Sequence, residues 1–527
     1  MLRRDFLNFL GKVGVVSLPL GIAPFGLLSS CSNSKQTNDL KRLGIEPSTE
    51  DNLILIDGLD YEVLCAWGDS INNVDYFGYN NDYTAFIPID NDSAIFWVNH
   101  EYPKPLFVSG YQGGLKTKEQ VDKELYNVGG SILKIKRTQA GKWKVVKGDK
   151  LNKRITGHTK IPFYWDEAIF GKSAAMGTLG NCSGGVTPWG TILTCEENYD
   201  AFYGEAIIQD GERTTSDPFL QYNKYYDNPP EHYGWVVEVN PLTGESKKLV
   251  ALGRFMHECA TIQELDDGRL VVYTGDDTNN QCLYKFISDK PGSLKEGKLY
   301  VASLEQKKWL SLDINDNEAL KEHFKTQTQV QIRTREAAHF IGATPLDRPE
   351  DIDIDPITGD VFISLTNNKD KGNAHGSILK LHEKEGDKSS LEFDYEHFLT
   401  GGPESGFTCP DNLAFDKKGN LWFTTDMSGY LVGVPPYESF GNNGLFVFFR
   451  SGPHQGQLAQ IASAPVDAEL TGPTFSPDGK TLFLSVQHPG EYSKSLKDLS
   501  SDWPDKNGAI PKPAVVSIQG PFLDSLV

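Results

Sequence analysis

Short apolar runs, each introduced by a turn that contains glycine, dominate the hydrophobic pattern of this chain. Five such units recur: Thr-Pro-Trp-Gly190 before Thr-Ile-Leu-Thr, Leu-Asp-Asp-Gly268 before Leu-Val-Val-Tyr-Thr, Pro-Ile-Thr-Gly359 before Val-Phe-Ile-Ser-Leu, Asp-Lys-Lys-Gly419 before Leu-Trp-Phe-Thr-Thr, and Ser-Pro-Asp-Gly479 before Leu-Phe-Leu-Ser-Val. Helical periodicity is scarce, and its two candidates run from Lys118 to Tyr126 and from Asn317 to Lys325.

The units lie roughly 60 to 90 residues apart, a spacing that suits propeller blades carrying insertions. A β-sandwich would need fewer units, and its turns need not repeat one signature. The pattern therefore predicts an all-β chain that forms a single six-bladed β-propeller with insertions between blade strands, in preference to several domains.

Each of these apolar strands ends in a polar or acidic group. The ends are Glu196-Glu197, Asp276-Asp277, Asn367-Asn368, Asp426 and Gln487-His488. Strands often run into polar loops, so one such end carries little information. If the blades are arranged radially, however, all five ends meet at one mouth of the central channel, and the pattern predicts a convergent polar site there.

The first thirty residues have the character of an export signal. Arg3-Arg4 followed by Phe6-Leu7 is a twin-arginine pattern, and Leu28-Ser29-Ser30-Cys31 resembles a lipobox. We expect residues 1–30 to be a twin-arginine lipoprotein signal, with Cys31 as the lipidated first residue of the mature chain. Residues 31–50 are expected to form a polar tether and residues 51–527 the propeller. The protein would then be anchored at the membrane and face the periplasm or the cell exterior.

Charge and cysteine content narrow the range of functions. A formal net charge of −20 argues against nucleic acid as a partner and fits cation binding, although a solvated acidic surface is the common alternative. No Cys-x-x-Cys pair occurs, so a zinc ribbon or a thioredoxin-type site is not expected. Outside the cytoplasm, some of the cysteines could form disulfides.

The segment from Asn181 to Asn198 combines several metal-competent groups. It holds Cys182, a glycine-rich stretch expected to form a turn, the strand Thr-Ile-Leu-Thr and then Glu196-Glu197. At a strand end both glutamates could turn toward one point and hold a hard cation. The alternative is a solvated pair beside a structural cysteine. Cys195 lies on the strand itself and is expected to be a core residue.

Further candidate ligands follow other strands or turns. They are Glu101 in Asn-His-Glu-Tyr, Glu258 after His257, Glu350 in Arg348-Pro349-Glu350, and Asp411 in Cys-Pro-Asp-Asn. Arginine binds paired phosphate oxygens well, so Arg348 beside these carboxylates indicates a phosphate subsite. A loop salt bridge is the other interpretation of Arg348.

Taken together, these blocks resemble the PhoX-type alkaline phosphatases, a family of twin-arginine-exported bacterial enzymes. The resemblance covers essentially the mature chain and rests on ordered blocks: Trp67-Gly68-Asp69, Val98 to Tyr102, Gly180 to Asn198, Tyr273 to Asp277, Arg348-Pro349-Glu350, Thr366 to Asn368, and Gln487 to Glu491. It implies a six-bladed propeller that hydrolyses phosphate monoesters, and a monomer.

The resemblance also implies a site with two ferric ions, three calcium ions and a bridging oxo group. Cys182 would be the thiolate ligand to iron. Glu196, Glu197, Glu258, Glu350 and Asp411 would be carboxylate ligands to iron or calcium. Arg348 would bind phosphate, and Lys172 is the candidate for a catalytic lysine near the Asn-Cys block. The donor chemistry agrees, because thiolate suits iron while calcium takes oxygen ligands.

Other functions remain possible at this stage. The same propeller could carry a phosphodiesterase, a phosphotriesterase or a calcium-dependent lactonase, although a lactonase needs neither Cys182 nor Arg348. A non-catalytic propeller lipoprotein is the alternative outside the enzymes. Metal content and hydrolysis of p-nitrophenyl phosphate separate these possibilities.

Overall fold

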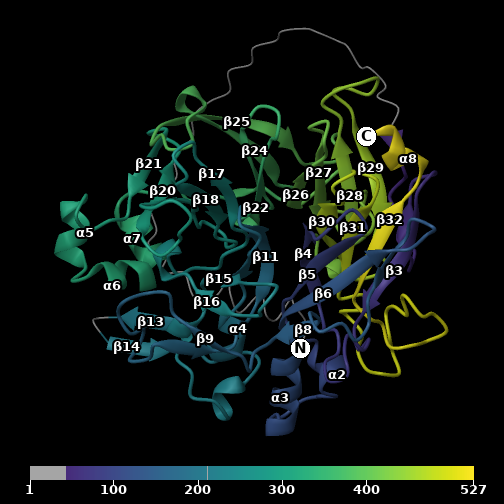
Figure 1. The fold of residues 1–527 in the computed structure, drawn as a ribbon, viewed down its shortest axis with the longest axis horizontal. Helices are drawn as coiled ribbons and strands as arrows, with labels where there is room; N and C mark the ends of the chain where they lie inside the picture. The colour runs from purple at the N-terminus through teal and green to yellow at the C-terminus, as the bar shows by residue number, and fades with distance from the viewer. Residues whose placement is uncertain (1–42, 210–211) are drawn as a thin grey trace, which may run out of the picture.

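The computed structural model describes residues 43–209 and 212–527, which form a six-bladed β-propeller (Figure 1). The predicted fold is therefore confirmed. The predictions for the export signal and for Cys31 fall on residues 1–42 and lie outside the described residues. None of the described helices is long and apolar enough to cross a bilayer.

Each blade is an antiparallel sheet whose first strand lies innermost. Blade 1 consists of β4 (Asn81–Pro88), β5 (Ser93–His100), β6 (Gly129–Arg137) and β7 (Trp143–Val145), with β8 (Lys153–Ile155) also on β6. Blade 2 consists of β11 (Asn181–Val186), β12 (Ile192–Glu196), β15 (Val236–Val239) and β16 (Ser246–Lys248). Blade 3 consists of β17 (Thr261–Glu264), β18 (Leu270–Gly275), β19 (Leu283–Ser288), β20 (Gly297–Ser303) and β21 (Lys308–Ser311).

The second half of the ring repeats this arrangement. Blade 4 consists of β22 (Pro349–Ile354), β23 (Val361–Leu365), β24 (Ser377–Glu383) and β25 (Phe393–Thr400). Blade 5 consists of β26 (Pro410–Phe415), β27 (Leu421–Thr425), β28 (Gly444–Phe448) and β29 (Leu458–Ser463). Blade 6 consists of β30 (Glu469–Phe475), β31 (Leu482–Gln487), β32 (Ala514–Gln519) and β3 (Asp60–Ala66).

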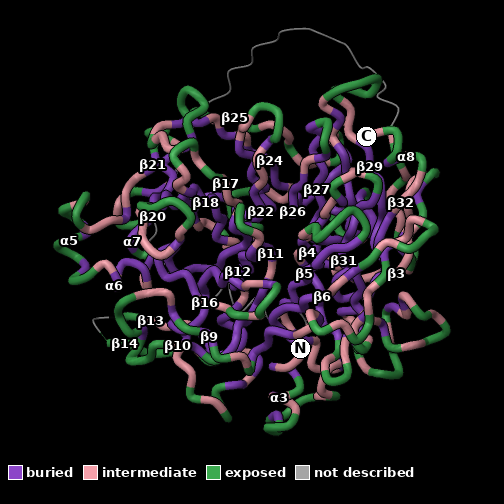
Figure 2. The backbone as a smooth tube through the Cα atoms, in the orientation of Figure 1, coloured by how far each residue is buried: buried purple, intermediate pink, exposed green. Residues whose placement is uncertain are grey.

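The ring closes in two ways. Neighbouring innermost strands contact one another around the full circle, from β4 through β11, β17, β22, β26 and β30 back to β4. In addition, β3 from the N-terminal part of the chain pairs antiparallel with β32 near the C-terminus and completes blade 6. The apolar core lies between blades, so the buried backbone follows the strands while exposed residues concentrate in the outer loops (Figure 2). For example, Phe483 of β31 packs against Phe86 and Phe96 of blade 1.

Residues 43–50 differ from the tether that the sequence predicted. The short strand β1 (Leu43–Gly44) pairs with β29 of blade 5 in parallel orientation. The next strand, β2 (Ile54–Leu55), pairs with β29 in antiparallel orientation. The carbonyl of Ser48 accepts a hydrogen bond from the N–H of Asn442 at 2.8 Å. Contact with the propeller therefore begins at Leu43, before the boundary predicted at residue 51.

The five predicted glycine turns are confirmed. Gly190, Gly268, Gly359, Gly419 and Gly479 have φ values of 81°, 79°, 74°, 73° and 73°, which is the left-handed region that favours glycine. Each of these turns joins the first and second strands of a blade. The turn of blade 1 was not predicted because it contains no glycine. In this turn, Asp90 Oδ1 accepts a hydrogen bond from the N–H of Asp92 at 2.9 Å.

The helices lie in insertions outside the blades. They are α2 (Pro105–Val108), α3 (Lys118–Asn127), α4 (Asp200–Tyr203), α5 (Glu318–His323), α6 (Gln327–Ile332), α7 (Thr334–Phe340) and α8 (Pro521–Ser525). Both helices expected from the sequence are present as α3 and α5. Two hairpins are also inserted. One consists of β9 (Lys160–Pro162) and β10 (Ala174–Met176) and lies between blades 1 and 2 in the sequence. The other consists of β13 (Ala206–Gln209) and β14 (Glu212–Thr215) and lies between the second and third strands of blade 2.

Candidate metal centre and active site

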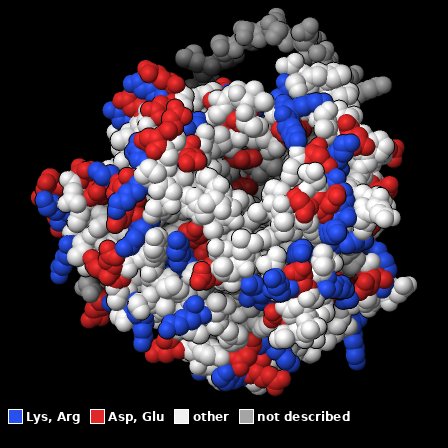
Figure 3. All heavy atoms as spheres, in the orientation of Figure 1, with Lys and Arg blue, Asp and Glu red and all other residues white. Residues whose placement is uncertain are grey.

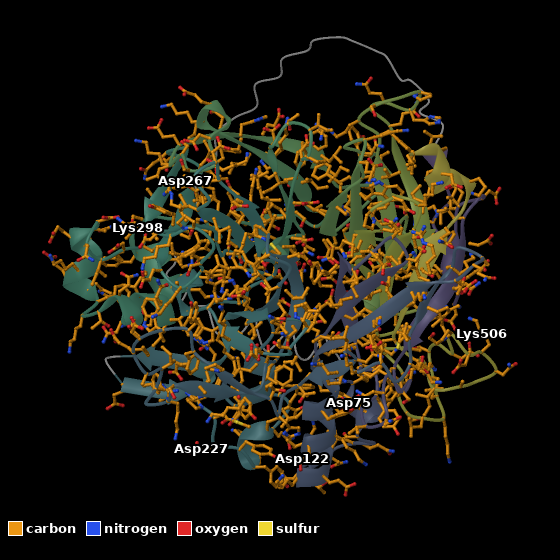
Figure 4. All side chains as sticks on the ribbon, in the orientation of Figure 1. Asp75, Asp122, Asp227, Asp267, Lys298 and Lys506 are labelled. Atoms are coloured by element: carbon orange, nitrogen blue, oxygen red, sulfur yellow. The ribbon has the colours of Figure 1, made fainter. Side chains whose placement is uncertain are left out.

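One mouth of the central channel opens into a cavity of about 1440 Å³. Twelve carboxylate side chains and six cationic side chains line it. On the outer surface, by contrast, charges of both signs are interspersed (Figure 3). Asp122, Asp267 and Lys298 lie at the periphery (Figure 4), where each pairs with an opposite charge at 2.6–2.7 Å. The uncompensated negative charge therefore gathers in the cavity.

The first set of lining groups stands where the innermost strands begin. Five blades contribute one metal-competent side chain each: Asp82, Cys182, Glu258, Glu350 and Asp411. Four of these directly follow a pairing residue after which the strand register shifts, a β-bulge that re-aims the chain. In the same four blades, the residue two positions earlier is left-handed, with φ between 51° and 65°: Asn80, Gly180, Arg348 and Cys409.

The second set of lining groups stands where the second strands end. Glu101, Glu197, Asp277, Asn367, Asp426 and Gln487 all line the cavity. Backbone bonds fix this set against the first, since Glu197 N–H donates to Gly180 at 2.7 Å and Asp426 N–H donates to Cys409 at 2.9 Å. The predicted convergence of strand ends on one mouth is therefore confirmed.

Only one member of each acidic pair faces the cavity, because the strand alternation persists to its end. Glu197 lines the cavity, whereas Glu196 is fully buried in blade 2 and its carboxylate binds Lys248 Nζ at 2.6 and 2.8 Å. Asp277 lines the cavity, whereas Asp276 forms an ion pair with Arg335. The expectation that Glu196 is a metal ligand is corrected here, because Lys248 already neutralises it.

The expected catalytic lysine also lies elsewhere. Lys172 is exposed on the hairpin between β9 and β10, where its backbone bonds to that of Ile169. It does not line the cavity. A second local correction concerns Gly184 and Gly185, which belong to strand β11 and not to a turn. A Cβ on Gly185 would lie 2.1 Å from the carbonyl oxygen of Ala260, so the neighbouring blade requires glycine there.

Cys182 stands at the centre of the acidic cluster. Its Sγ lies 3.3 Å from both Asp82 Oδ2 and Glu258 Oε1. Three overlapping groups each bring ligand atoms within 4.8 Å of one another: Asp82, Glu101 and Cys182; Cys182, Glu197 and Glu258; and Glu258, Asp277 and Glu350. Such a set can hold several cations side by side with shared ligands.

The electrostatics of this cluster suit bound cations. Burial raises the pKa of five carboxyl groups well above their usual range, and neighbouring carboxylates raise it further: Asp82, Glu197, Glu258, Glu350 and Asp411. The pKa of the Cys182 thiol is also raised, first by burial and then by Asp82 and Glu258. Within the described residues, the buried Asp82 Oδ1 and Glu258 Oε2 have no hydrogen-bond partner. Bound cations would ionise and satisfy these groups, so the residues fit a multinuclear metal centre.

Arg348 supplies a positive charge at the cavity wall. Its guanidinium binds Asp277 through two bonds of 2.8 Å and contacts Glu350 at 2.7 Å and Asp426 at 3.2 Å. These contacts use Nε and Nη2, and no described residue accepts a hydrogen bond from Nη1. The arginine is therefore held in place while keeping donors for an anion.

Several lining residues were not among the predicted ligands. Asp82, Asp277 and Asp426 complete the acidic cluster, and Glu469 and Glu491 line the cavity beside blade 6. Asp277 and Asp426 could have been selected, since both end predicted strands. Asp82 could have been found from the repeat itself, because Asn-Asn-Asp82 matches Gly-Asn-Cys182 in position. Cys195 is confirmed as a core residue with no exposed surface.

Comparisons with known proteins agree with this geometry. A solved structure of Pseudomonas fluorescens PhoX in complex with vanadate, a transition state analogue, is 29% identical, with a TM-score of 0.82 over 92% of this chain and 98% of that chain. A Xanthomonas campestris gluconolactonase matches at 11% identity over 92% of this chain and 99% of that chain. Its TM-score of 0.37 is too low to support a functional inference. No curated protein sequence matches significantly.

A sequence model of one family covers most of the chain. The model described as alkaline phosphatase PhoX matches residues 42–490, which span all the strands that line the cavity. The chain therefore belongs to the PhoX alkaline phosphatase family, and this membership implies metal-dependent phosphomonoesterase activity on phosphate esters.

Proposed function

We propose that the protein is an exported, lipid-anchored phosphatase that hydrolyses phosphate monoesters at a centre of two ferric and three calcium ions with a bridging oxo group. Of the predicted ligands, Cys182, Glu197, Glu258, Glu350 and Asp411 would hold the cations. We add Asp82 and Asp277 as candidates and keep Glu101, which the sequence had already indicated. The observation that carries the proposal is the partly buried thiol within 3.3 Å of two carboxylates, each of which has an oxygen without a partner among the described residues.

Donor types support this choice of metals. A thiolate is a soft ligand that suits iron and not calcium, whereas carboxylates suit calcium in flexible numbers. Burial and the neighbouring carboxylates raise the pKa of the Cys182 thiol, and a bound cation would favour loss of its proton. When bound, the cations would polarise the phosphoryl oxygens and offset the negative charge that otherwise repels a phosphate ester.

Arg348 would orient the phosphoryl group. Its Nη1 is the donor that the acidic residues leave unused, and its two remaining nitrogens are held by Asp277, Glu350 and Asp426. A fixed guanidinium places its donors before the substrate arrives, so little reorganisation is needed as negative charge builds on the transferred group. No histidine of the described residues lines the cavity, and the proposal includes no proton transfer by imidazole.

Export in the folded state suits this topology. The strand β3 pairs with β32 from the far end of the chain, so blade 6 is complete only after the whole chain has been made. The twin-arginine route carries folded proteins, and metals could then be inserted before export. A lipid on Cys31 would hold the protein at the membrane, facing the periplasm or the exterior, and the propeller is expected to be a monomer.

Metal analysis of Cys182→Ala tests the centre. We expect the wild type to contain iron and calcium by mass spectrometry and to hydrolyse p-nitrophenyl phosphate in a chelator-sensitive manner. Cys182→Ala should lose iron and activity together. Cys409→Ala is the matched control, since Cys409 lines the same cavity but belongs to none of the three ligand groups. Unchanged iron in Cys182→Ala, or zinc alone in the wild type, would overturn the proposal.

A further inference from the structure

Lys369 extends the cavity wall beyond the acidic cluster. It begins the short 3₁₀ turn η4 (Lys369–Lys371), which follows the end of β23 and contains no buried residue. Its side chain lines the same cavity as Arg348, Asn367 and Asp426. Lys369 therefore stands at the same cavity as the proposed phosphate-binding arginine, but on an exposed turn toward solvent.

The backbone of this turn is fixed relative to Arg348. Asn368 N–H donates to Asn373 at 2.6 Å, and Asn373 N–H donates back to Asn368 at 3.0 Å. The side chains of both asparagines donate to Asp347, at 2.9 and 3.1 Å. Because Asp347 directly precedes Arg348, one carboxylate ties the turn to the arginine. The backbone of the turn is thus held by hydrogen bonds, and the Lys369 side chain extends from this fixed backbone.

The ammonium of Lys369 forms no ion pair with any described carboxylate. Its Nζ lies 5.1 Å from the centre of the Tyr437 ring, a cation–π distance that leaves its N–H donors available. Burial lowers its pKa; among charged groups, Cys409 and Asp426 raise it and Arg348 lowers it. Lys369 and Arg348 line the same cavity.

Two cations of this cavity and one cation of the η4 turn are already engaged by carboxylates. Arg348 is surrounded by three carboxylates, and the cavity-lining Lys116 forms a fully buried pair with Glu124 at 2.5 Å. Lys371, in the same turn as Lys369, pairs with Asp347 at 3.1 Å. Lys369 therefore offers positive charge and free donors to a group that approaches past Arg348.

From this arrangement, we propose that Lys369 is a positioning residue that binds a second anionic group on the leaving portion of the substrate. The enzyme would then favour phosphate esters that carry a second phosphate over esters with a neutral leaving group. The inference rests on the proposed function, because it assumes that the transferred phosphate lies against Arg348. A lysine on a solvent-facing wall suits this role, since its long stem lets a point charge follow leaving groups of different lengths.

Kinetics with a matched substrate pair test the inference. Glucose 1,6-bisphosphate and glucose 6-phosphate differ by one phosphate, and cleavage at C6 is followed in both, as initial formation of glucose 1-phosphate and of glucose, so that the ratio of the kcat/KM values reports the second anion. In Lys369→Gln we expect that ratio to fall about three- to tenfold, as for a partly exposed charged contact. The change should lie in KM, with kcat nearly unchanged, and Lys369→Arg should restore most of it. Lys371→Gln is the control and should leave the ratio unchanged.

Each result decides between explanations. An unchanged ratio in Lys369→Gln, or an equal loss for both esters, would overturn the role of Lys369 while the activity of the wild type still supports the proposed function. A wild type that hydrolyses neither ester would overturn the proposed function instead. In that case, calorimetric binding of the same two esters to the metal-loaded protein makes the same comparison without turnover.

Discussion

The buried pair of Lys248 and Glu196 offers the sharpest test of how this site is supported. Both side chains are fully buried. Lys248 Nζ donates to the two carboxylate oxygens at 2.6 and 2.8 Å and to the carbonyl of His232 at 2.8 Å. Glu196 also accepts from the N–H groups of Leu179 and Trp235 at 3.1 Å. We change Lys248 to Met, which keeps the volume and removes the charge.

The expected cost follows from what remains behind. Lys248→Met leaves a buried carboxylate with two backbone donors and no counter-charge, a situation that typically destabilises by about 3–5 kcal/mol. Burial lowers the pKa of Lys248, and the neighbouring Glu196 opposes part of that shift. The double variant Glu196→Gln with Lys248→Met buries no charge. Its loss of unfolding free energy should therefore be smaller than the sum of the single losses, by about 2 kcal/mol.

Unfolding and metal content are measured on the same samples. Urea unfolding, followed by tryptophan fluorescence, gives the free energies, and mass spectrometry gives iron and calcium. The double variant should keep its metals, because Glu196 faces the blade and not the cavity. A Lys248→Met variant within about 1 kcal/mol of the wild type would refute the energetic argument. A stable double variant that has lost its metals would show that Glu196 is a ligand after all.

Two further predictions follow from the cavity and from the blade behind it. Arg348→Lys keeps the charge but loses the paired donors, so kcat/KM for p-nitrophenyl phosphate should fall about 100-fold or more at unchanged iron content; a loss under threefold would argue against phosphate binding by this residue. Burial lowers the pKa of His232 from 6.5 to about 4. Because the unfolded chain then binds the proton first, stability should decrease as the pH falls from 6.5 toward 4, and a His232→Gln variant should show a flatter profile in thermal unfolding at several pH values.

Local signals were enough to predict the blades but not the way in which the ring closes. A glycine with positive φ is demanded by the turn itself, so Gly190 and its four counterparts mark their hairpins without knowledge of the rest of the fold. The pairing of β3 with β32 joins opposite ends of the chain, and no local pattern encodes it. The predicted tether was wrong over residues 43–50 for the same reason, because their composition gave no sign of the contacts with β29.

The same limit applies to the site, where local features could be predicted and contacts between distant segments could not. Strand ends are local features, and the predicted ends at Glu197, Asp277 and Asp426 do line the cavity. The sequence Glu196-Glu197 alone, however, does not show which of the two glutamates faces the cavity. Only the position of Lys248, about fifty residues later, decides which glutamate turns into the blade. The proposal of iron and calcium comes from the family resemblance, because carboxylates alone do not select iron and the case for it depends on Cys182.

The bulged starts of the inner strands explain why the candidate ligands of one blade can stand so close to those of the next. A regular strand would point alternate residues into the neighbouring blades, whereas a left-handed residue followed by a bulge turns the next side chain into the channel. Asn80 and Gly180 adopt this conformation readily, but Arg348 and Cys409 do so at a cost of about 1–2 kcal/mol each. Such strain persists only where the surroundings enforce it. At Arg348 the three carboxylates supply that force, so the same contacts that fix the guanidinium also hold the backbone that presents Glu350.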